Sequence, residues 1–312
     1  MVPGMLFLTS HLVVALVALV GIGGATRVMQ AGLACPDWPL CYGSLLPGGQ
    51  MNLQVFLEWF HRLDAFLVGI GLVVLLVISL LKRSSLPVWL PWASGAALLL
   101  VAFQGALGAL TVTQLLRFDL VTAHLATALV LVALLSAIHQ GLAFRPDPAS
   151  SVQPPTKGVL SGWTAAWWLA PAAAGLAVFI QAISGALMAS QWASGRCLAS
   201  GEACQWLALH RQLATPVAAA VVALSLAPSL LQGPLRRHWP LATAAVVLVT
   251  LQVLLGVFTL RLALAVPLLT VGHQITAALL VAVLAALAVR TWRSSVPSAD
   301  LGRSPRMQTS HG

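Results

Sequence analysis

Charged side chains are scarce in this chain of 312 residues, in which Lys, Arg, Asp and Glu together make up 7%. A soluble globular domain carries about 25% charged residues, so this scarcity excludes an ordinary soluble domain. The chain is instead 59% hydrophobic, with a mean hydropathy of +0.94. These values indicate a polytopic membrane protein.

Acidic residues are the scarcest charged class, with 7 Asp and Glu against 16 Lys and Arg and a net charge of +9. A basic protein can bind nucleic acid when its Lys and Arg side chains form a continuous face. Here they mark loops and the ends of apolar segments. Nucleic acid is therefore excluded as a partner, and membrane lipid is the expected environment.

Eight apolar segments approach or exceed the length of about 20 residues that a membrane-spanning helix needs. The first has no Lys or Arg before Arg27, so it lacks the basic start of a signal peptide and is interpreted as a retained helix. The predicted fold is all-α, with membrane helices at 5–26, 55–81, 88–113, 118–144, 164–190, 206–231, 239–262 and 266–290.

The distribution of Lys and Arg predicts the orientation of these helices. With the N-terminus in the cytoplasm, the inner side carries 10 Lys and Arg with 2 acids, and the outer side carries 6 with 5 acids. This bias fits the positive-inside rule, which counts Lys and Arg. Both termini are therefore predicted to be cytoplasmic in a multi-pass protein of the cell membrane.

The four cysteines fall in two loops on the predicted outer side, Cys35 and Cys41 in one and Cys197 and Cys204 in the other. Disulfides persist on that side of a cell membrane. Two local disulfides, Cys35–Cys41 and Cys197–Cys204, are predicted. A zinc site is the weaker alternative, because neither spacing is that of common structural zinc sites and no His lies between the cysteines.

A segment rich in Pro and Ser at 145–162 interrupts the apolar pattern and is interpreted as a cytoplasmic linker. It separates four-helix units at 1–144 and 163–293, and a polar tail at 294–312 is predicted to be disordered. Four helices per unit give both units the same orientation, so we expect two parallel repeats. The residues matched between the units are His61-Arg62 with His210-Arg211, Gln104 and Gly108 with Gln252 and Gly256, and Gly24 with Gly185.

The repeat is clearest at four histidines. The same offset of 149 positions separates His61 from His210 and His124 from His273. At about 1.5 Å per residue, each lies within about two turns of the outer end of its helix. Two histidines at one depth on different helices suit the two axial positions of a haem. The alternative, buried neutral histidines bonded to backbone carbonyls, is less favoured for four residues at matched positions.

Charged residues beside these histidines are further candidates. Arg62 and Arg211 directly follow a histidine and could pair with haem propionates, or could simply extend to the membrane interface. Arg27 and Arg261 are weaker candidates of the same kind. Glu58 precedes His61 by three residues and shares its helix face. It could move protons or stabilise a cation, or form a surface ion pair with Arg62.

The two units differ at this carboxylate, because Leu207 stands at the position before His210 that matches Glu58. A carboxylate beside only one histidine pair predicts a division of labour. The C-terminal unit would hold a fixed redox haem, and the N-terminal unit would carry out chemistry.

The motifs GIGGATRV (21–28), CPDWPLC (35–41) and EWFHR (58–62), with the His124 helix and the second-half histidines, resemble the haem A synthase family over essentially all eight segments. The resemblance implies oxidation of the C8 methyl group of haem O to a formyl group by successive hydroxylations, giving haem A for terminal oxidases. Water is the implied oxygen source. The implied partners are the substrate haem O, an electron acceptor and the upstream haem O synthase, with homo-oligomerisation left open.

The resemblance also implies roles for individual residues. His210 and His273 would ligate a resident haem b, and His61 and His124 would bracket haem O. Glu58 would be the catalytic carboxylate, stabilising a cation at the methyl carbon before water attacks. Cys35 and Cys41 match a pair that forms a disulfide and affects activity, either through redox chemistry or as a loop staple, and Cys197–Cys204 would be structural.

Two other classes remain as alternatives. A di-haem membrane cytochrome b that only transfers electrons explains the histidines equally well, but leaves the unmatched Glu58 and the Trp-Pro sequence of the first cysteine loop unexplained. A transporter or assembly factor that binds haem without altering it is the third class. The lack of a carboxylate at mid-membrane depth in the sequence argues against ion transport.

Overall fold

The computed structural model describes residues 2–144, 166–193, 195, 204–230 and 238–295. Their regular structure is helical, and eight of the helices are long and apolar enough to cross a membrane. This confirms the predicted all-α membrane fold and its eight spans, so the chain is a multi-pass membrane protein. The linker at 145–162, the tail from 296 onward and Cys197 lie outside the described residues.

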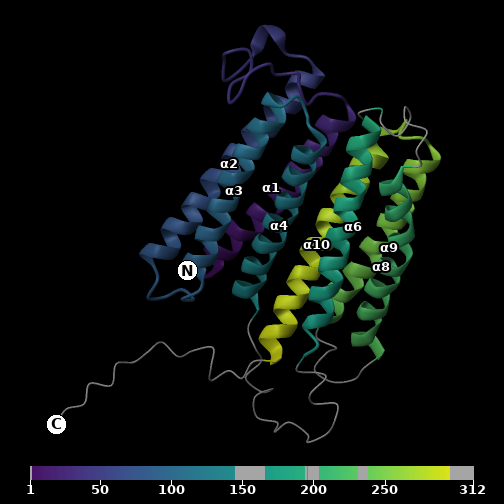
Figure 1. The fold of residues 1–312 in the computed structure, drawn as a ribbon. Coiled ribbons are helices and arrows are strands. Elements are labelled where there is room, and N and C mark those ends of the chain that lie inside the picture. Colours follow the sequence, from purple (N-terminus) through teal and green to yellow (C-terminus); the bar gives the residue numbers. More distant parts are fainter. Residues whose placement is uncertain (1, 145–165, 194, 196–203, 231–237, 296–312) are drawn as a thin grey trace, which may run out of the picture.

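The helices pack as two groups of four (Figure 1). The first group is α1 (Val2–Val28), α2 (Leu53–Leu81), α3 (Leu90–Thr113) and α4 (Phe118–Ala143), and the second is α6 (Leu169–Ala193), α8 (Gln205–Leu230), α9 (Trp239–Arg261) and α10 (Pro267–Ser295). We call them the first and second bundles. The helix ends differ from the predicted ones by a few residues, and Ser294 and Ser295 are helical although the predicted tail begins at 294.

The helix starts follow from local chemistry. The side chain of Asn52 caps α2 by accepting a hydrogen bond from the backbone N–H of Val55 at 3.0 Å. Helices α3 and α9 have proline in their first turn, and α10 begins at Pro267, where the missing N–H would have had no partner in the helix.

The turn between α3 and α4 has a close counterpart between α9 and α10. Leu115 and Leu116 both have left-handed φ angles, as do Ala263 and Leu264. In each turn the second residue's N–H reaches back five positions, from Leu116 to the carbonyl of Thr111 and from Leu264 to that of Thr259. Two consecutive non-glycine residues in this region are uncommon. The same unusual turn therefore precedes both α4 and α10.

The bundles meet along α1, α4, α6 and α10. Small residues of α10, Ala278 and Ala282, are buried at this junction, which allows close helix approach in the manner of membrane proteins. The hydroxyl of Ser136 on α4 donates to the carbonyl of Ala282 at 2.6 Å. Side-chain hydrogen bonds as well as apolar contacts cross this junction, so residues of one bundle contact residues of the other.

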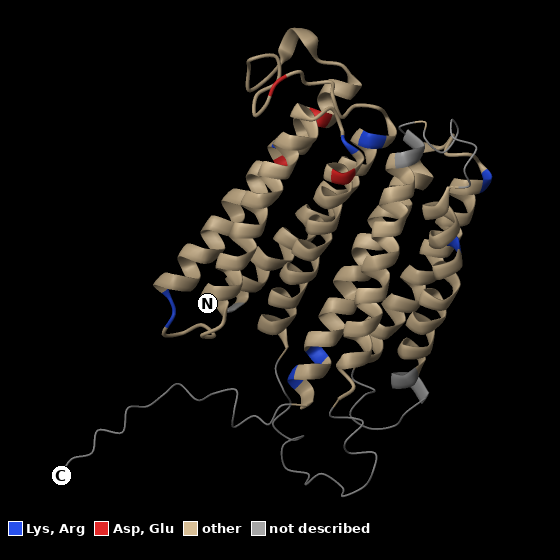
Figure 2. Cartoon of the chain, viewed as in Figure 1, with Lys and Arg blue, Asp and Glu red and all other residues tan. Residues whose placement is uncertain are grey.

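The two ends of the molecule differ in charge. The cysteine loop lies at one end, and the start of α1 and the end of α10 lie at the other (Figure 1). All four acids of the described residues, Asp37, Glu58, Asp64 and Asp119, are at the cysteine-loop end (Figure 2).

Candidate functional site

The structure brings the four predicted histidines together in two pairs. His61 of α2 and His124 of α4 have ring centroids 6.3 Å apart, and His210 of α8 and His273 of α10 have centroids 6.4 Å apart. Two imidazoles on opposite sides of one metal ion, each with a nitrogen about 2 Å from it, place their centroids about 6 Å apart. Both pairs therefore fit two axial ligands of one haem iron.

A glycine on the preceding helix faces each histidine ring. A Cβ added at Gly23, Gly185 or Gly256 would lie 3.0, 2.9 or 2.9 Å from the Cε1 of His61, His210 or His273 respectively. At Gly108, facing His124, the same distance is 3.7 Å, an ordinary contact. Three of the rings thus lie closer to their glycine than a side chain at that position would allow without a shift. The predicted match of Gly24 with Gly185 is wrong by one position, because Gly23 faces the histidine.

A glutamine precedes three of these four glycines by four positions. Gln104, Gln181 and Gln252 occupy this place on α3, α6 and α9, whereas α1 has Leu19. The side-chain amide of Gln181 donates to the carbonyl of His210 at 2.6 Å, and that of Gln104 donates to the carbonyl of His124 at 3.0 Å. Gln181 is not among the residues predicted above, although the shared spacing is visible in the sequence.

The second-bundle histidines are anchored through Nδ1. The Nδ1 of His210 donates to the carbonyl of Gln181 at 3.1 Å and lies 3.0 Å from the hydroxyl of Ser184, and that of His273 donates to the carbonyl of Gln252 at 3.0 Å. Such a bond fixes the ring and leaves Nε2 for a metal. The Nε2 of His273 lies 3.2 Å from the side-chain amide of Gln252.

The first-bundle histidines lack this anchor. Among the described residues, the Nδ1 atoms of His61 and His124 are buried without a hydrogen bond. The carbonyl of Leu19 faces His61, but the contact does not reach hydrogen-bonding geometry. The two pairs share their separation and differ in how firmly their rings are held.

A cavity of about 340 Å³ adjoins the second pair. His210, His273, Gln181 and Gln252 line it, together with the exposed Arg211 beside His210. Arg27 of the first bundle also lines this cavity. Its place in the chain assigns it to the first unit, at 1–144, and the fold brings it to the cavity of the second bundle.

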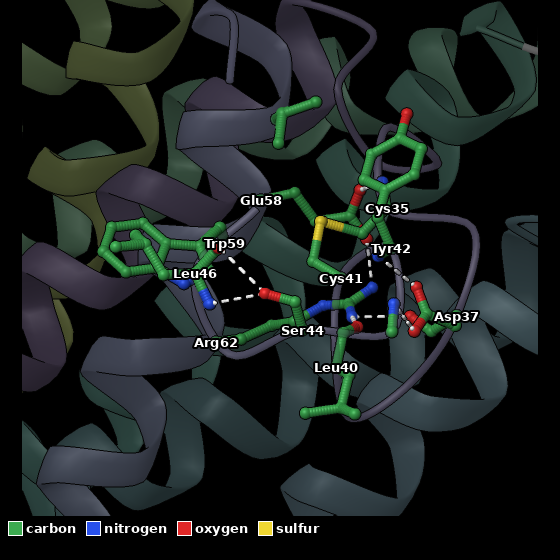
Figure 3. Close-up of a disulfide and its surroundings, with 12 residues drawn as sticks. Cys35, Asp37, Leu40, Cys41, Tyr42, Ser44, Leu46, Glu58, Trp59 and Arg62 are labelled. Carbon is green, nitrogen blue, oxygen red and sulfur yellow. Dashed lines mark hydrogen bonds and ion pairs between the residues drawn. A yellow bond between two sulfur atoms is a disulfide. The ribbon is translucent and has the colours of Figure 1, made fainter. Parts of the chain in front are cut away.

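Around the first pair, the predicted disulfide Cys35–Cys41 is confirmed (Figure 3). The zinc site considered as an alternative for this loop is therefore wrong, because the two sulfurs are bonded to each other. The second predicted disulfide is only partly described: Cys204 is disulfide-bonded, and Cys197 lies outside the described residues.

Glu58 lies beneath this disulfide loop with 4% of its surface exposed (Figure 3). Its Oε2 accepts the backbone N–H of Cys35 at 2.8 Å, and its Oε1 pairs with Nη2 of Arg62 at 2.6 Å. The ion pair considered as an alternative for Glu58 is therefore present, but it is buried under the loop and not on the surface.

Arg62 also holds the loop itself. Its Nη1 donates to the carbonyl of Asp37 at 2.6 Å and to the carbonyl of Leu40. These contacts occupy the guanidinium for which the sequence left two alternatives, a haem propionate and the membrane interface. In this structure Arg62 joins the loop to Glu58.

The loop is also braced from within. The carboxylate of Asp37 accepts the backbone N–H groups of Gly43 at 2.8 Å and Tyr42 at 2.6 Å. These bonds, that of Gly43 above all, hold the pKa of Asp37 below its usual value. The indole of Trp59 on α2 donates to the carbonyl of Leu45 at 2.6 Å and ties the far side of the loop to the helix.

The remaining described histidines make local contacts away from these pairs. His11 is exposed and bonds the carbonyl of Phe7, and His139 bonds the hydroxyl of Thr9. His238 is buried against the ring of Phe144.

Comparison with known proteins gives one family. Residues 5–285 match the COX15-CtaA family, described as cytochrome oxidase assembly protein. The chain is 30% identical over 329 residues to the Heme A synthase of Sphingopyxis alaskensis, covering 89% of each chain. It is 32% identical over 335 residues to that of Caulobacter vibrioides, covering 88% of this chain and 92% of the relative. A shorter match, 38% identical over 135 residues, covers 38% of this chain and 39% of the Heme A synthase of Shewanella oneidensis. With two histidine pairs, an eight-helix membrane fold and a match over most of its length, the chain belongs to the haem A synthase family of cytochrome oxidase assembly proteins.

Proposed function

We propose that this chain is a haem A synthase that oxidises the C8 methyl group of haem O to a formyl group. Replacing the methyl group by a formyl group consumes one water and releases four electrons and four protons. The observation that carries the proposal is the presence of two histidine pairs at nearly equal separation and of one buried carboxylate, Glu58, which stands one helical turn before a histidine of only one pair. The full-length relatives named Heme A synthase support it.

The second site is proposed to hold haem b between His210 and His273. The fit rests on their separation, on the glycines that their rings require and on the carbonyls that receive Nδ1. Anchored ligands suit a permanent cofactor, because partners of this kind can change metal affinity by about 10–100-fold. When bound, haem b supplies one-electron chemistry that carries electrons away from the substrate.

The first site is proposed to bracket the substrate haem O between His61 and His124. A substrate must enter and its product must leave, so loosely held ligands are suitable here. The Nδ1 atoms of both histidines have no hydrogen bond among the described residues. The rings can therefore reorient at lower cost than those of the second site.

Glu58 is the proposed catalytic carboxylate. One turn of α2 separates it from His61, so it is placed to stabilise positive charge at the methyl carbon and to accept a proton from the attacking water. The backbone N–H of Cys35 and the guanidinium of Arg62 fix its two oxygens. The contacts of Arg62 favour a role in positioning Glu58 over direct propionate binding, and the Cys35–Cys41 disulfide holds the loop that completes this arrangement.

The arrangement in the cell membrane is part of the proposal. Both termini would be cytoplasmic, and the histidine pairs and cysteine loops would face outward, in two parallel repeats at 1–144 and 163–293. The distribution of Lys and Arg along the sequence supports the orientation, and the matched turns after α3 and α9 support the repeats. The proposed partners are haem O synthase, which supplies the substrate, and a membrane electron acceptor.

A di-haem cytochrome b is the second candidate function, favoured by the near-equal separations of the two pairs. Pigment extraction separates the two. Membranes that contain the chain and a source of haem O should accumulate haem A if it is the enzyme. An electron carrier would leave haem O unchanged, and that result would contradict our proposal.

The role of Glu58 is tested in the same assay. Glu58→Ala should abolish haem A and keep the haem b spectrum. Asp119→Ala is the matched control. Asp119 also lies at the cysteine-loop end and pairs with an arginine, but this pair is on the exposed surface. Normal haem A production by Glu58→Ala would show that this carboxylate is not catalytic.

A further inference from the structure

Arg27 crosses from the first bundle into the cavity of the second. It lies in the last turn of α1, and its Nη2 donates to the side-chain oxygen of Gln274 on α10 at 3.3 Å. Gln274 directly follows His273, and both residues line the cavity. The guanidinium therefore lies beside the second histidine pair, although its helix belongs to the bundle of the first.

The charge of Arg27 has no carboxylate partner in the described part of the chain. The ion pairs there are Glu58–Arg62 and Arg117–Asp119. Arg27 is half-buried, and the amide oxygen of Gln274 carries no formal charge to balance it. A charge withdrawn from water is costly unless an opposite charge accompanies it. This environment is suited to an anion that enters with a ligand.

The contact between α1 and α10 holds Arg27 in this direction. The side-chain amide of Gln274 donates to the carbonyl of Val20 at 3.0 Å, which leaves its oxygen for Arg27. A Cβ added at Gly24 would lie 2.8 Å from that oxygen. Gly24 thus makes room for Gln274, and Gln274 orients the guanidinium. The second-bundle residue Arg211 adds another cation to the wall of the same cavity.

We infer that Arg27 and Arg211 form a carboxylate-binding subsite of the second cavity, so that the first bundle completes the second bundle's site. A guanidinium can hold a carboxylate by two parallel hydrogen bonds. This inference rests on the proposed function, in which the ligand is haem b and the carboxylates are its propionates. It assigns Arg27 to the cofactor of the other bundle and not to the substrate bound beside its own.

The test compares haem b with its dimethyl ester, in which both propionates are uncharged. The full-length chain, purified without haem in detergent, is titrated with each compound, and binding is followed by the absorption of the six-coordinate haem. To restrict binding to the second site, every protein carries His61→Ala. Losing a charge-assisted hydrogen bond costs about tenfold or more in affinity, so the parent should prefer haem b over the ester by at least that factor.

Arg27→Gln should lose most of this preference, and Arg27→Lys should keep part of it because it keeps the charge. Arg261→Gln is the matched control, an exposed arginine at the same end of the molecule that does not line the cavity. The preference is a ratio within one protein, so a general loss of fold does not imitate the result. An undiminished preference in Arg27→Gln would overturn the inference.

A further variant separates this inference from the proposed function. His210→Ala should remove the six-coordinate spectrum with either compound. If it does so while Arg27→Gln keeps the full preference, the haem b site stands and the Arg27 assignment fails. If His210→Ala keeps a normal spectrum, the proposed haem b site fails, and the Arg27 assignment fails with it.

Discussion

The histidines of the two sites have nearly the same separation but different surroundings. In the second, Nδ1 of each ring bonds a backbone carbonyl, and a cavity adjoins the pair. In the first, Nδ1 of each ring makes no hydrogen bond among the described residues, and the buried Glu58 stands three residues before His61 on α2. Under the proposed function, one helical framework serves two purposes. The spacing of the histidines is common to both sites, while the anchoring of the rings and the nearby charge differ.

Substituting the histidines should produce the largest difference between the two sites. We expect His210→Ala and His273→Ala to lose the resident haem b spectrum, because each removes one of the two axial ligands. His61→Ala and His124→Ala should keep that spectrum and lose haem A. Absorption spectra of purified protein and pigment extraction measure the two effects. Retention of a normal low-spin spectrum in both second-site variants would refute the assignment.

The glycines provide a matched pair across the bundles. Gly256→Ala places a methyl group 2.9 Å from His273, whereas Gly108→Ala, at the predicted equivalent position, places one 3.7 Å from His124. Overpacking of this kind costs about 1–3 kcal/mol. Gly256→Ala should therefore weaken haem b retention by about tenfold or more, as measured by titration. Gly108→Ala should leave haem A production near normal, and equal damage by both would contradict the distances.

Opening the disulfide should affect only the first site. Cys35→Ser frees the loop whose backbone N–H bonds Glu58 and whose carbonyls bond Arg62. Haem A production should fall several-fold, and haem b content should stay at the level of the parent protein. Cys35→Ser with Cys41→Ser should equal the single variant if the bond acts as a staple. A loss of haem b in these variants would show that the loop also supports the second site.

Protonation of Asp37 at acid pH should weaken the hydrogen bonds that hold the Cys35–Cys41 loop. We expect this effect to be the smallest of those predicted. Because its pKa lies below the usual value of 3.8, the bonded carboxylate stabilises the folded loop above that pH and loses this contribution as the pH falls through its lowered pKa. The rate at which a phosphine reduces Cys35–Cys41 should rise modestly in that acid range. Asp37→Asn should remove this dependence, and an unchanged acid profile would show that Asp37 does not control the loop.

The fold could be predicted from the sequence because a membrane allows very few backbone structures. A run of about 20 apolar residues must form a helix there to satisfy its own backbone, and eight such runs define the spans. The histidines were found because a polar residue in such a span is costly and four of them share one offset. The family followed from CPDWPLC and EWFHR, whose spacing is visible in the chain.

Contacts between distant segments could not be found in this way. The position of Arg27 depends on the packing of α1 against α10, which joins residues 247 positions apart. Arg62 has several acceptors within reach, and only the folded loop shows that the carbonyls of Asp37 and Leu40 take its hydrogen bonds. The glycine that corresponds to Gly185 could be found only from the rotation of α1, which turns Gly23 and not Gly24 toward a histidine.

The sequence by itself determined the eight helices, the cysteine loop and the four histidines, because hydropathy and residue spacing act locally along the chain. The tertiary structure decided which rings are anchored, where the charge of Glu58 is balanced and which bundle's cavity Arg27 lines. Those outcomes depend on the rotation and approach of whole helices, since a difference of one residue turns a side chain by about 100° around its helix.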